Sequence, residues 1–408
     1  MKHTENRQEI ISNKIVIFGA GKIGRSFIGQ LFGSSGYSIV FVDVDPVVIS
    51  LLNERKGYRV IIKGDSEEVI NISEVSAING RDPDAVATAV AGAGIAAVSV
   101  GKNALEKVLP FIAAGLVKRH AGYPDRPLDI ILAENMRSAA EFTAGQLRNS
   151  LPQDFPLESY VGLIETSIGK MVPIMPSADI EKDPLQVFAE PYNTLILDGR
   201  GFKSAIPDVK GLAPKNNIKA WVDRKAFIHN LGHATAAYYG NYHYPQAVYM
   251  YEILDHPSIL NFTRKVMLQS AGILREEYPG EFTTEDLEHH IDDLLHRFRN
   301  KVLRDTIFRV GQDLARKLGH DDRFMGAINL ARSHGKDFDL ILEAMSYGFT
   351  FSATDEDGHP FPGDVTFREA LAGSFDSAVT EILGYNVTGD EVIIEAIRQK
   401  YKKLLVRL

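Results

Sequence analysis

The sequence contains no cysteine in its 408 residues. Disulfide bonds, thiolate metal sites and cysteine nucleophiles are therefore excluded by composition alone. It also lacks any apolar run near the roughly 18 residues that a membrane span requires, and its first residues have no apolar segment typical of a signal peptide. We therefore expect a cytoplasmic protein with no membrane partner.

An excess of positive charge is missing as well, because the formal net charge is −8. This balance argues against nucleic acid as a partner, although a local basic patch could still hold an anionic substrate. A hydrophobic content of 45% in a chain of this length allows a large interior and more than one domain. We expect an enzyme for a small-molecule substrate that is a monomer or a small homo-oligomer.

A glycine-rich turn follows the first apolar segment. Residues 14–18 are a β-branched run typical of a buried strand, and Gly19, Gly21 and Gly24 follow in the spacing GxGxxG before a helical stretch at 25–32. In a dinucleotide-binding fold these glycines allow the tight turn, the approach of a pyrophosphate and the packing of the helix. The cofactor contacts predicted in this turn are Gly19, Ala20, Gly21, Lys22, Ile23 and Gly24.

An acidic residue ends the second predicted strand, 38–43. Asp43 lies about 20 residues beyond the glycine turn, at the position where a carboxylate meets the adenosine ribose. The residues that follow include no arginine to receive a 2′-phosphate. The sequence therefore predicts NAD rather than NADP, while a solvated carboxylate at a strand end is the alternative for Asp43.

The pattern of elements changes along the chain. Four more strands are predicted in the first half, at 58–63, 95–101, 128–133 and 160–164. Long amphipathic stretches follow at 219–239, 245–254, 257–277, 284–301, 303–318, 323–333, 338–347, 365–384 and 390–405, with a loop at 349–363. We expect an α/β Rossmann domain with a doubly wound, mostly parallel sheet over residues 1–205, followed by an all-α substrate-binding domain over 206–408.

Three polar residues lie on one predicted helix, the stretch 219–239. On an α-helix Lys225, Asn230 and His233 fall within an arc of about 140°, so their side chains can converge. A desolvated lysine can act as a general base near neutral pH, an amide N–H can stabilise charge on a carbonyl oxygen, and a histidine can hold a hydroxyl. Taken singly, a solvated lysine and a satisfied helix histidine are the commoner interpretations.

A zinc site formed by two histidines is a weaker interpretation of the same helix. His229 and His233 form an i, i+4 pair, but no acidic or cysteine third ligand lies nearby in the sequence. We expect no metal site.

The motif Lys225-x4-Asn230-x2-His233 resembles that of the polyol-specific long-chain dehydrogenases, which are metal-independent and join a Rossmann domain to a helical domain. Further segments that carry the resemblance are residues 18–29, 133–136, 223–239 and 309–318. It implies that Lys225 is the base, that Asn135 and Asn230 stabilise the oxyanion, and that His233 positions the substrate. The substrate contacts it suggests are Arg309, Lys170, Arg316 and Lys317, and the further cofactor contacts are Val100, Gly101, Glu134 and Asn135.

The resemblance leaves the substrate open. Gly169 and Lys170 stand where the family usually has Asp-Arg, and Gln312 stands where the enzymes for phosphorylated polyols tend to have arginine. The first expectation is interconversion of a sugar-alcohol phosphate and a ketose phosphate, with mannitol 1-phosphate and fructose 6-phosphate as the best pair. The alternatives are an unphosphorylated polyol or a hexuronate, and a regulatory NAD-binding protein without turnover.

Overall fold

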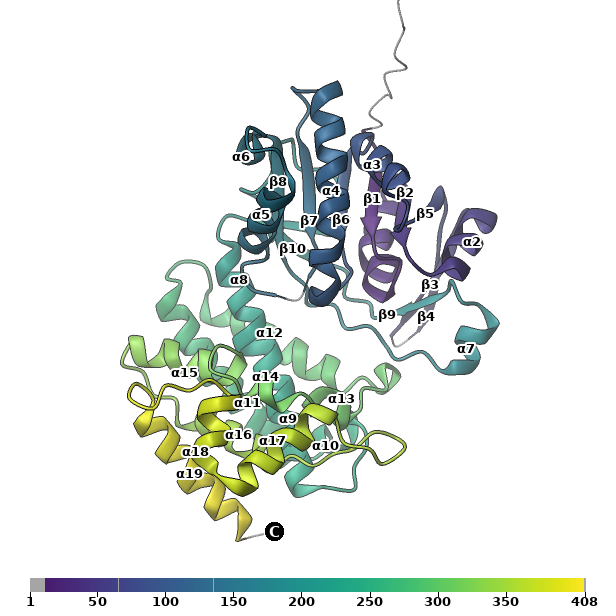
Figure 1. Cartoon of the computed structure of the whole chain (residues 1–408). Coiled ribbons are helices and arrows are strands. Elements are labelled where there is room, and N and C mark those ends of the chain that lie inside the picture. Colours follow the sequence, from purple (N-terminus) through teal and green to yellow (C-terminus); the bar gives the residue numbers. More distant parts are fainter. Residues whose placement is uncertain (1–11, 65, 135, 407–408) are drawn as a thin grey trace, which may run out of the picture. The chain divides into compact units, whose positions relative to one another are not determined.

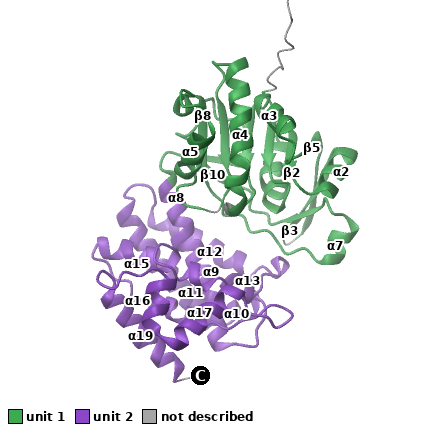
Figure 2. Cartoon of the chain, viewed as in Figure 1, with its two compact units in different colours: residues 1–218 green, residues 219–408 purple. Residues whose placement is uncertain are grey.

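The protein divides into two compact units, coloured separately in Figure 2, with the boundary between Ile218 and Lys219. The computed structural model describes residues 12–64, 66–134 and 136–406. The first unit is an α/β domain and the second is helical (Figure 1), so the predicted fold class is confirmed.

An eight-stranded sheet forms the centre of the first unit. Its strands, in spatial order, are β11 (Leu212–Lys215), β10 (Leu195–Asp198), β8 (Val161–Ser167), β7 (Leu128–Leu132), β6 (Ile95–Val98), β1 (Lys14–Phe18), β2 (Ser38–Asp43) and β5 (Val75–Asn79). Pairing is parallel throughout except between β8 and β10. Strand order reverses at β1, which pairs with both β2 and β6, and open α/β sheets bind ligands at the carboxyl ends of strands beside such a reversal.

Alternate residues of β1 bury against opposite layers of helices. Ile15 and Ile17 belong to the core formed with η1 (Gly24–Gly29) and α1 (Gln30–Gly33), whereas Val16 and Phe18 belong to the core under α3 (Pro83–Ala91) and α4 (Lys102–Gly122). The remaining helices of this unit are α2 (Pro46–Arg55), α5 (Ala139–Ser150), α6 (Leu157–Tyr160) and α7 (Ser177–Lys182). Burial on both faces explains why the strands read as continuous apolar runs.

Two expectations for this unit need correction. The strand expected at 58–63 in the doubly wound sheet, β3 (Tyr58–Lys63), lies in a separate sheet between β4 (Glu67–Ile72) and β9 (Val187–Ala189), as Figure 1 shows. The short link from β3 to β4 suits an antiparallel hairpin, because a parallel neighbour would need a longer crossover. The unit also extends past the boundary expected at 205, because β11 pairs with β10 and completes the sheet.

The second unit consists of helices in the part of the chain that the structure describes. They are α8 (Ile218–Arg224), η2 (Lys225–Asn230), α9 (Leu231–His243), α10 (Met250–Leu254), α11 (Pro257–Glu277), α12 (Thr284–Phe298), η3 (Lys301–Leu303), α13 (Ile307–Gly311), α14 (Leu314–Lys317), α15 (Arg323–Ser333), α16 (Asp339–Gly348), α17 (Pro362–Gly373), α18 (Phe375–Ser377), η4 (Ala378–Ile382) and α19 (Glu391–Leu405). None of the helices described in either unit is both long and apolar enough to span a bilayer.

Two expected helices are broken. The stretch expected at 365–384 is interrupted at Ser374, whose backbone is extended, so that α17 ends before α18 and η4. The stretch 303–318 forms two short helices, α13 and α14, because the chain leaves helical geometry at Gln312 and takes a left-handed conformation at Asp313, with φ of 73°. Asp364 receives the freed N–H groups of Asp313, at 3.2 Å, and Leu314, at 2.7 Å. The break turns the cationic side chains of this stretch toward different partners.

Candidate active site

The glycine turn after β1 fits a dinucleotide. Gly19 has φ of +92°, and a Cβ there would lie 2.6 Å from the carbonyl oxygen of Ser99. A Cβ on Gly24 would lie 1.9 Å from the carbonyl oxygen of Gly19. Both positions therefore require glycine for packing. A Cβ on Gly21 would meet nothing within 4 Å, so the turn is open at the position where a pyrophosphate would approach.

The helix that follows begins with a π-turn, in which hydrogen bonds link residues five apart and one carbonyl is left over. The hydroxyl of Tyr58 donates to the carbonyl of Arg25 over 2.9 Å. The buried guanidinium of Arg25 donates to the carbonyls of Ala20, at 2.6 Å, and Leu185, at 2.5 Å. Arg25 thus stabilises the glycine turn, and these N–H donors of its guanidinium are occupied by protein carbonyls.

Asp43 is held firmly at the end of β2. Its Oδ2 accepts the N–H of Ala20 at 2.6 Å, and its Oδ1 accepts those of Val44 at 2.7 Å and Asp45 at 3.0 Å. An ionised carboxylate has about four acceptor positions, so these bonds leave about one for a ribose hydroxyl. The carboxylate therefore has a structural role in the turn and is also placed where a ribose contact is predicted.

Glu134 organises the loop after β6. Its buried Oε1 accepts the N–H groups of Val100, at 2.8 Å, and Gly101, at 3.1 Å. Burial raises the pKa of this carboxyl, while the two N–H donors act in the opposite direction. The N–H groups of Val100 and Gly101 are thus occupied by Glu134, and these residues would line the cofactor site through their other atoms. The prediction for Asn135 lies outside the described residues.

The segment with the three polar residues is not a regular α-helix. Lys225–Asn230 forms a π-turn between α8 and α9, so Asn230 follows Lys225 by the five-residue step of that turn. The N–H of Leu231 bonds to the carbonyls of Ala226 and Ile228 and skips that of Phe227. A regular α-helix would separate Lys225 and Asn230 by about 140° around its axis, and the wider turn reduces that angle.

Neighbouring helices support this π-turn. The buried hydroxyl of Ser270, on α11, donates to the skipped carbonyl of Phe227 over 2.6 Å. Arg323, the first residue of α15, donates from Nη1 to the carbonyl of Asn230 over 3.2 Å. Both carbonyls lie in the part of the helix that carries the predicted site.

The surroundings of Lys225 favour the neutral amine that a general base requires. Its side chain is partly buried, and its pKa is lowered from 10.5 to about 8, first by burial and second by the charge of Arg323. Both effects disfavour the ammonium form. About a tenth of the side chain is therefore free amine at pH 7.

His233 lies close to Phe298 and Asp305, and Asp305 in turn binds Arg309. Its ring stacks on Phe298, with centroids 4.3 Å apart, and its Nε2 lies 3.3 Å from Oδ2 of Asp305 without the geometry of a hydrogen bond. Oδ1 of Asp305 accepts from Nε of Arg309 at 2.5 Å. Burial lowers the pKa of His233, and Asp305 only partly opposes this. The ring is therefore neutral near pH 7.

The structure brings Arg309 beside His233 through Asp305, but it gives the other predicted cations separate partners. Arg316 donates from Nε to Asp313 at 2.5 Å. Lys317 is buried and donates to the carbonyl of Val310 at 2.6 Å, and burial lowers its pKa to about 7.

Lys170 belongs to the first unit. It is buried there, donates to the side-chain oxygens of Gln30 at 2.8 Å and Asn193 at 2.7 Å, and has a pKa lowered to about 7 by burial. A Cβ on Gly169 would meet only Tyr192, at 3.5 Å, so local packing does not demand a glycine there.

Three residues that support the site were not predicted from the sequence. These residues are Ser270, Asp305 and Arg323. Only Asp305 had a local signal, because it precedes Arg309 by four residues, the spacing of an ion pair on a helix. Ser270 and Arg323 act on residues 43 and 93 positions away, for which one sequence has no signal.

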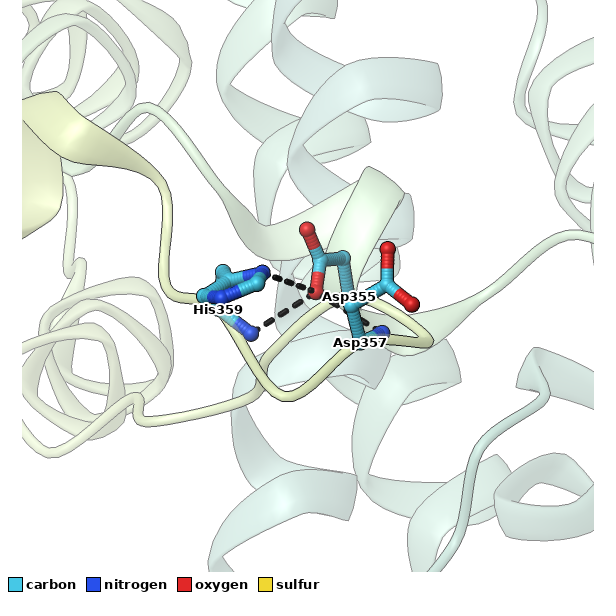
Figure 3. Close-up of side chains that lie close together, drawn as sticks. All are labelled: Asp355, Asp357 and His359. Carbon is cyan, nitrogen blue, oxygen red and sulfur yellow. Dashed lines mark hydrogen bonds and ion pairs between the residues drawn. The ribbon is translucent and has the colours of Figure 1, made fainter.

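The ring centroids of the two histidines considered for zinc, His229 and His233, lie 6.2 Å apart. In the part of the chain that the structure describes, metal-ligating side chains gather instead at Asp355, Asp357 and His359, whose ligand atoms lie within 4.8 Å of one another (Figure 3). These residues lie on the loop between α16 and α17, and Oδ1 of Asp355 already accepts the N–H of His359 at 2.7 Å. The three side chains are distinct from the group around Lys225.

Comparisons with known proteins agree with the two-part architecture. Residues 13–211 match the model of the mannitol dehydrogenase Rossmann domain, and residues 217–405 match that of the mannitol dehydrogenase C-terminal domain. Similar solved structures include Pseudomonas fluorescens mannitol 2-dehydrogenase in complex with NAD and D-mannitol, at 16% identity and a TM-score of 0.77, with 96% of this chain and 91% of that chain covered. A substrate-free D-sorbitol dehydrogenase aligns at 14% identity and a TM-score of 0.77, with 97% and 93% covered.

Proposed function

Because the chain belongs to the mannitol dehydrogenase family, we propose that it is an NAD-dependent dehydrogenase that interconverts a polyol and a ketose at a secondary carbinol. The observation that carries the chemical part of this proposal is the partly buried Lys225, with its pKa lowered to about 8, on a π-turn together with Asn230. A metal-independent reaction at a carbinol needs such a base.

In the oxidation, the free amine of Lys225 takes the proton from the substrate hydroxyl as the carbinol carbon loses its hydride. NAD, when bound, supplies the hydride acceptor. In the reduction, the ammonium form of Lys225 returns the proton to the carbonyl oxygen. The amide N–H of Asn230 stabilises the charge that develops on that oxygen, and neutral His233 orients a neighbouring hydroxyl.

The residues that would hold NAD are those of the glycine turn and of the end of β2. Open space at Gly21 supports the approach of a pyrophosphate, and the acceptor position left on Asp43 supports a bond from a ribose hydroxyl. A 2′-phosphate beside this carboxylate would be repelled, which supports the choice of NAD over NADP.

For the substrate we propose D-mannitol 1-phosphate and D-fructose 6-phosphate. The support is the resemblance of the segments around Lys225 and Arg309 to mannitol-1-phosphate 5-dehydrogenases, together with the half-exposed guanidinium of Arg309. A second candidate, an unphosphorylated polyol or hexuronate, is favoured by the partners of Arg316, Lys317 and Lys170, because a dianionic phosphate needs two or more converging donors.

A panel of NADH oxidation assays separates these candidates. Fructose 6-phosphate, fructose, tagaturonate and fructuronate are compared with the wild-type enzyme and with Arg309→Ala. We expect fructose 6-phosphate to have the highest kcat/KM and Arg309→Ala to raise its KM far more than that of fructose. Equal kcat/KM for both ketoses would rule out a phosphate site. Absence of turnover with every polyol and ketose would instead favour a regulatory NAD-binding protein.

A further inference from the structure

Arg323 lies next to the π-turn but was not among the predicted site residues. It is 7% exposed at the start of α15, where Nε donates to Oδ1 of Asp322 over 2.7 Å. Its Nη1 reaches the carbonyl of Asn230, the last residue of the π-turn, over 3.2 Å. The guanidinium therefore joins the beginning of one helix to the functional segment of another.

This contact is unusual for a helix interior, where carbonyls are normally satisfied by the helix itself. A π-turn inside an α-helix is a rare local arrangement that is frequently found at functional sites. Ser270 donates a hydrogen bond to the carbonyl of Phe227, which the N–H of Leu231 skips. Arg323 donates to the carbonyl of Asn230, at the end of the turn. Because the guanidinium is planar and forked, it can hold Asp322 and Asn230 in one fixed orientation.

We propose that Arg323 is a positioning residue, which holds the π-turn at Asn230 and places a fixed positive charge at the end of the turn that carries Lys225. The inference rests on the proposed function, in which Lys225 is the base. Arg323 itself is buried by protein atoms and acts on the reaction through Asn230 and Lys225.

The electrostatic part of the inference concerns the proton on Lys225. Besides burial, Arg323 is the charge among the described residues that lowers the pKa of Lys225, and the carboxylate of Asp322 stays close to that guanidinium. The histidines near the π-turn, His229 on η2, His233 on α9 and His290 on α12, all have lowered pKa values, so they are neutral above pH 7. Arg297, on α12, stays charged and acts on His229. The three histidines therefore keep one charge state between pH 7 and 10, whereas Lys317, which also interacts with Arg323 and has its pKa lowered to about 7, loses most of its charge by pH 8.

Two substitutions separate the charge from the hydrogen bond. Arg323→Gln removes the positive charge, so the midpoint for deprotonation of Lys225 should rise toward 10.5 by up to about one pH unit, since burial is the larger cause and remains. The oxidation rate on the acidic side of the profile then falls by up to about tenfold. Arg323→Lys keeps the charge but loses the forked donor, so the midpoint should stay near that of the wild type while kcat falls.

Arg332→Gln is the matched control, because Arg332 lies on the same helix and makes equivalent bonds, to Asp390 at 2.9 Å and to the carbonyl of Gly389 at 2.7 Å. Its removal tests the cost of losing a carbonyl-binding arginine from α15 away from Lys225. We expect a loss of stability without any change in the midpoint.

The experiment measures the midpoint in two ways on the full-length protein. The first is the rate of acylation of Lys225 by an amine reagent at each pH, read by peptide mass spectrometry without substrate or cofactor. The second is the pH dependence of polyol oxidation. An unchanged acylation midpoint in folded Arg323→Gln would overturn the inference. If that variant does not fold, a large midpoint shift in Arg323→Lys, or a kcat equal to that of the wild type, would overturn it.

Failure of the inference is distinguishable from failure of the proposed function. If Lys225→Ala retains activity, Lys225 is not the base and the mechanism given with the proposed function is wrong. If Lys225→Ala is inactive while Arg323→Gln keeps the wild-type midpoint, only the role of Arg323 is wrong.

Discussion

Lys225 provides the sharpest test of the chemistry, because its altered proton affinity has a calculable consequence. Lowering the pKa from 10.5 to about 8 raises the fraction of free amine at pH 7 from about 0.03% to about 9%, or roughly 300-fold. A solvated lysine could not supply a base at this pH. The oxidation rate should therefore rise up to about pH 8 and level off above it, while the reduction rate falls over the same range.

Replacing Lys225 by alanine or methionine should lower kcat for oxidation by about 10²–10⁴-fold, the usual cost of removing a general base. The affinity for NADH, measured by fluorescence titration, should stay nearly unchanged. Lys265→Ala is the matched control, because Lys265 is an exposed lysine on α11 of the same unit. A Lys225 variant that kept more than a tenth of the wild-type rate, or a pH profile unaltered by the substitution, would refute the reasoning.

The same substitution has a consequence for stability that does not depend on activity. The folded pKa of Lys225, about 8, is below the unfolded value, so the native state is penalised for holding the ammonium form. The penalty is fully present below pH 8, at up to about 3 kcal/mol, and disappears as the pH rises from 8 to 10.5. Lys225→Met should therefore raise the melting temperature at pH 7 and lose this advantage near pH 10.5.

Three further substitutions test the groups around the two predicted sites. Asp43→Ala should narrow the preference for NAD over NADP, chiefly by weakening NAD, and equal use of both cofactors by the wild type would contradict this. Asp305→Asn weakens the hydrogen bond that orients Arg309, so KM should rise about ten- to hundredfold with a smaller change in kcat. Steady-state kinetics in which kcat fell and KM stayed constant would contradict this prediction. Ser270→Ala removes the buried hydrogen bond to the carbonyl of Phe227, so chemical denaturation should show a loss of about 1–3 kcal/mol.

Much of the first unit is predictable from local sequence. Buried parallel strands need continuous apolar runs, and the turn after β1 needs glycine at Gly19 and Gly24, where a side chain would collide with neighbouring backbone. These requirements act over a few residues, so they appear directly as motifs. The place of β3 was not predictable in this way, because an apolar strand does not specify which sheet receives it.

The residue types of the second predicted site are also a property of the sequence, since Lys225, Asn230 and His233 stand at a recognisable spacing. Their arrangement is not. The π-turn depends on Ser270 and Arg323, and the partner of Arg309 depends on the break between α13 and α14. The lowered pKa of Lys225 also depends on the tertiary structure, because the side chains that pack around a residue decide how far it is buried. One sequence records which groups are present, and only the folded chain brings distant helices close enough to desolvate them.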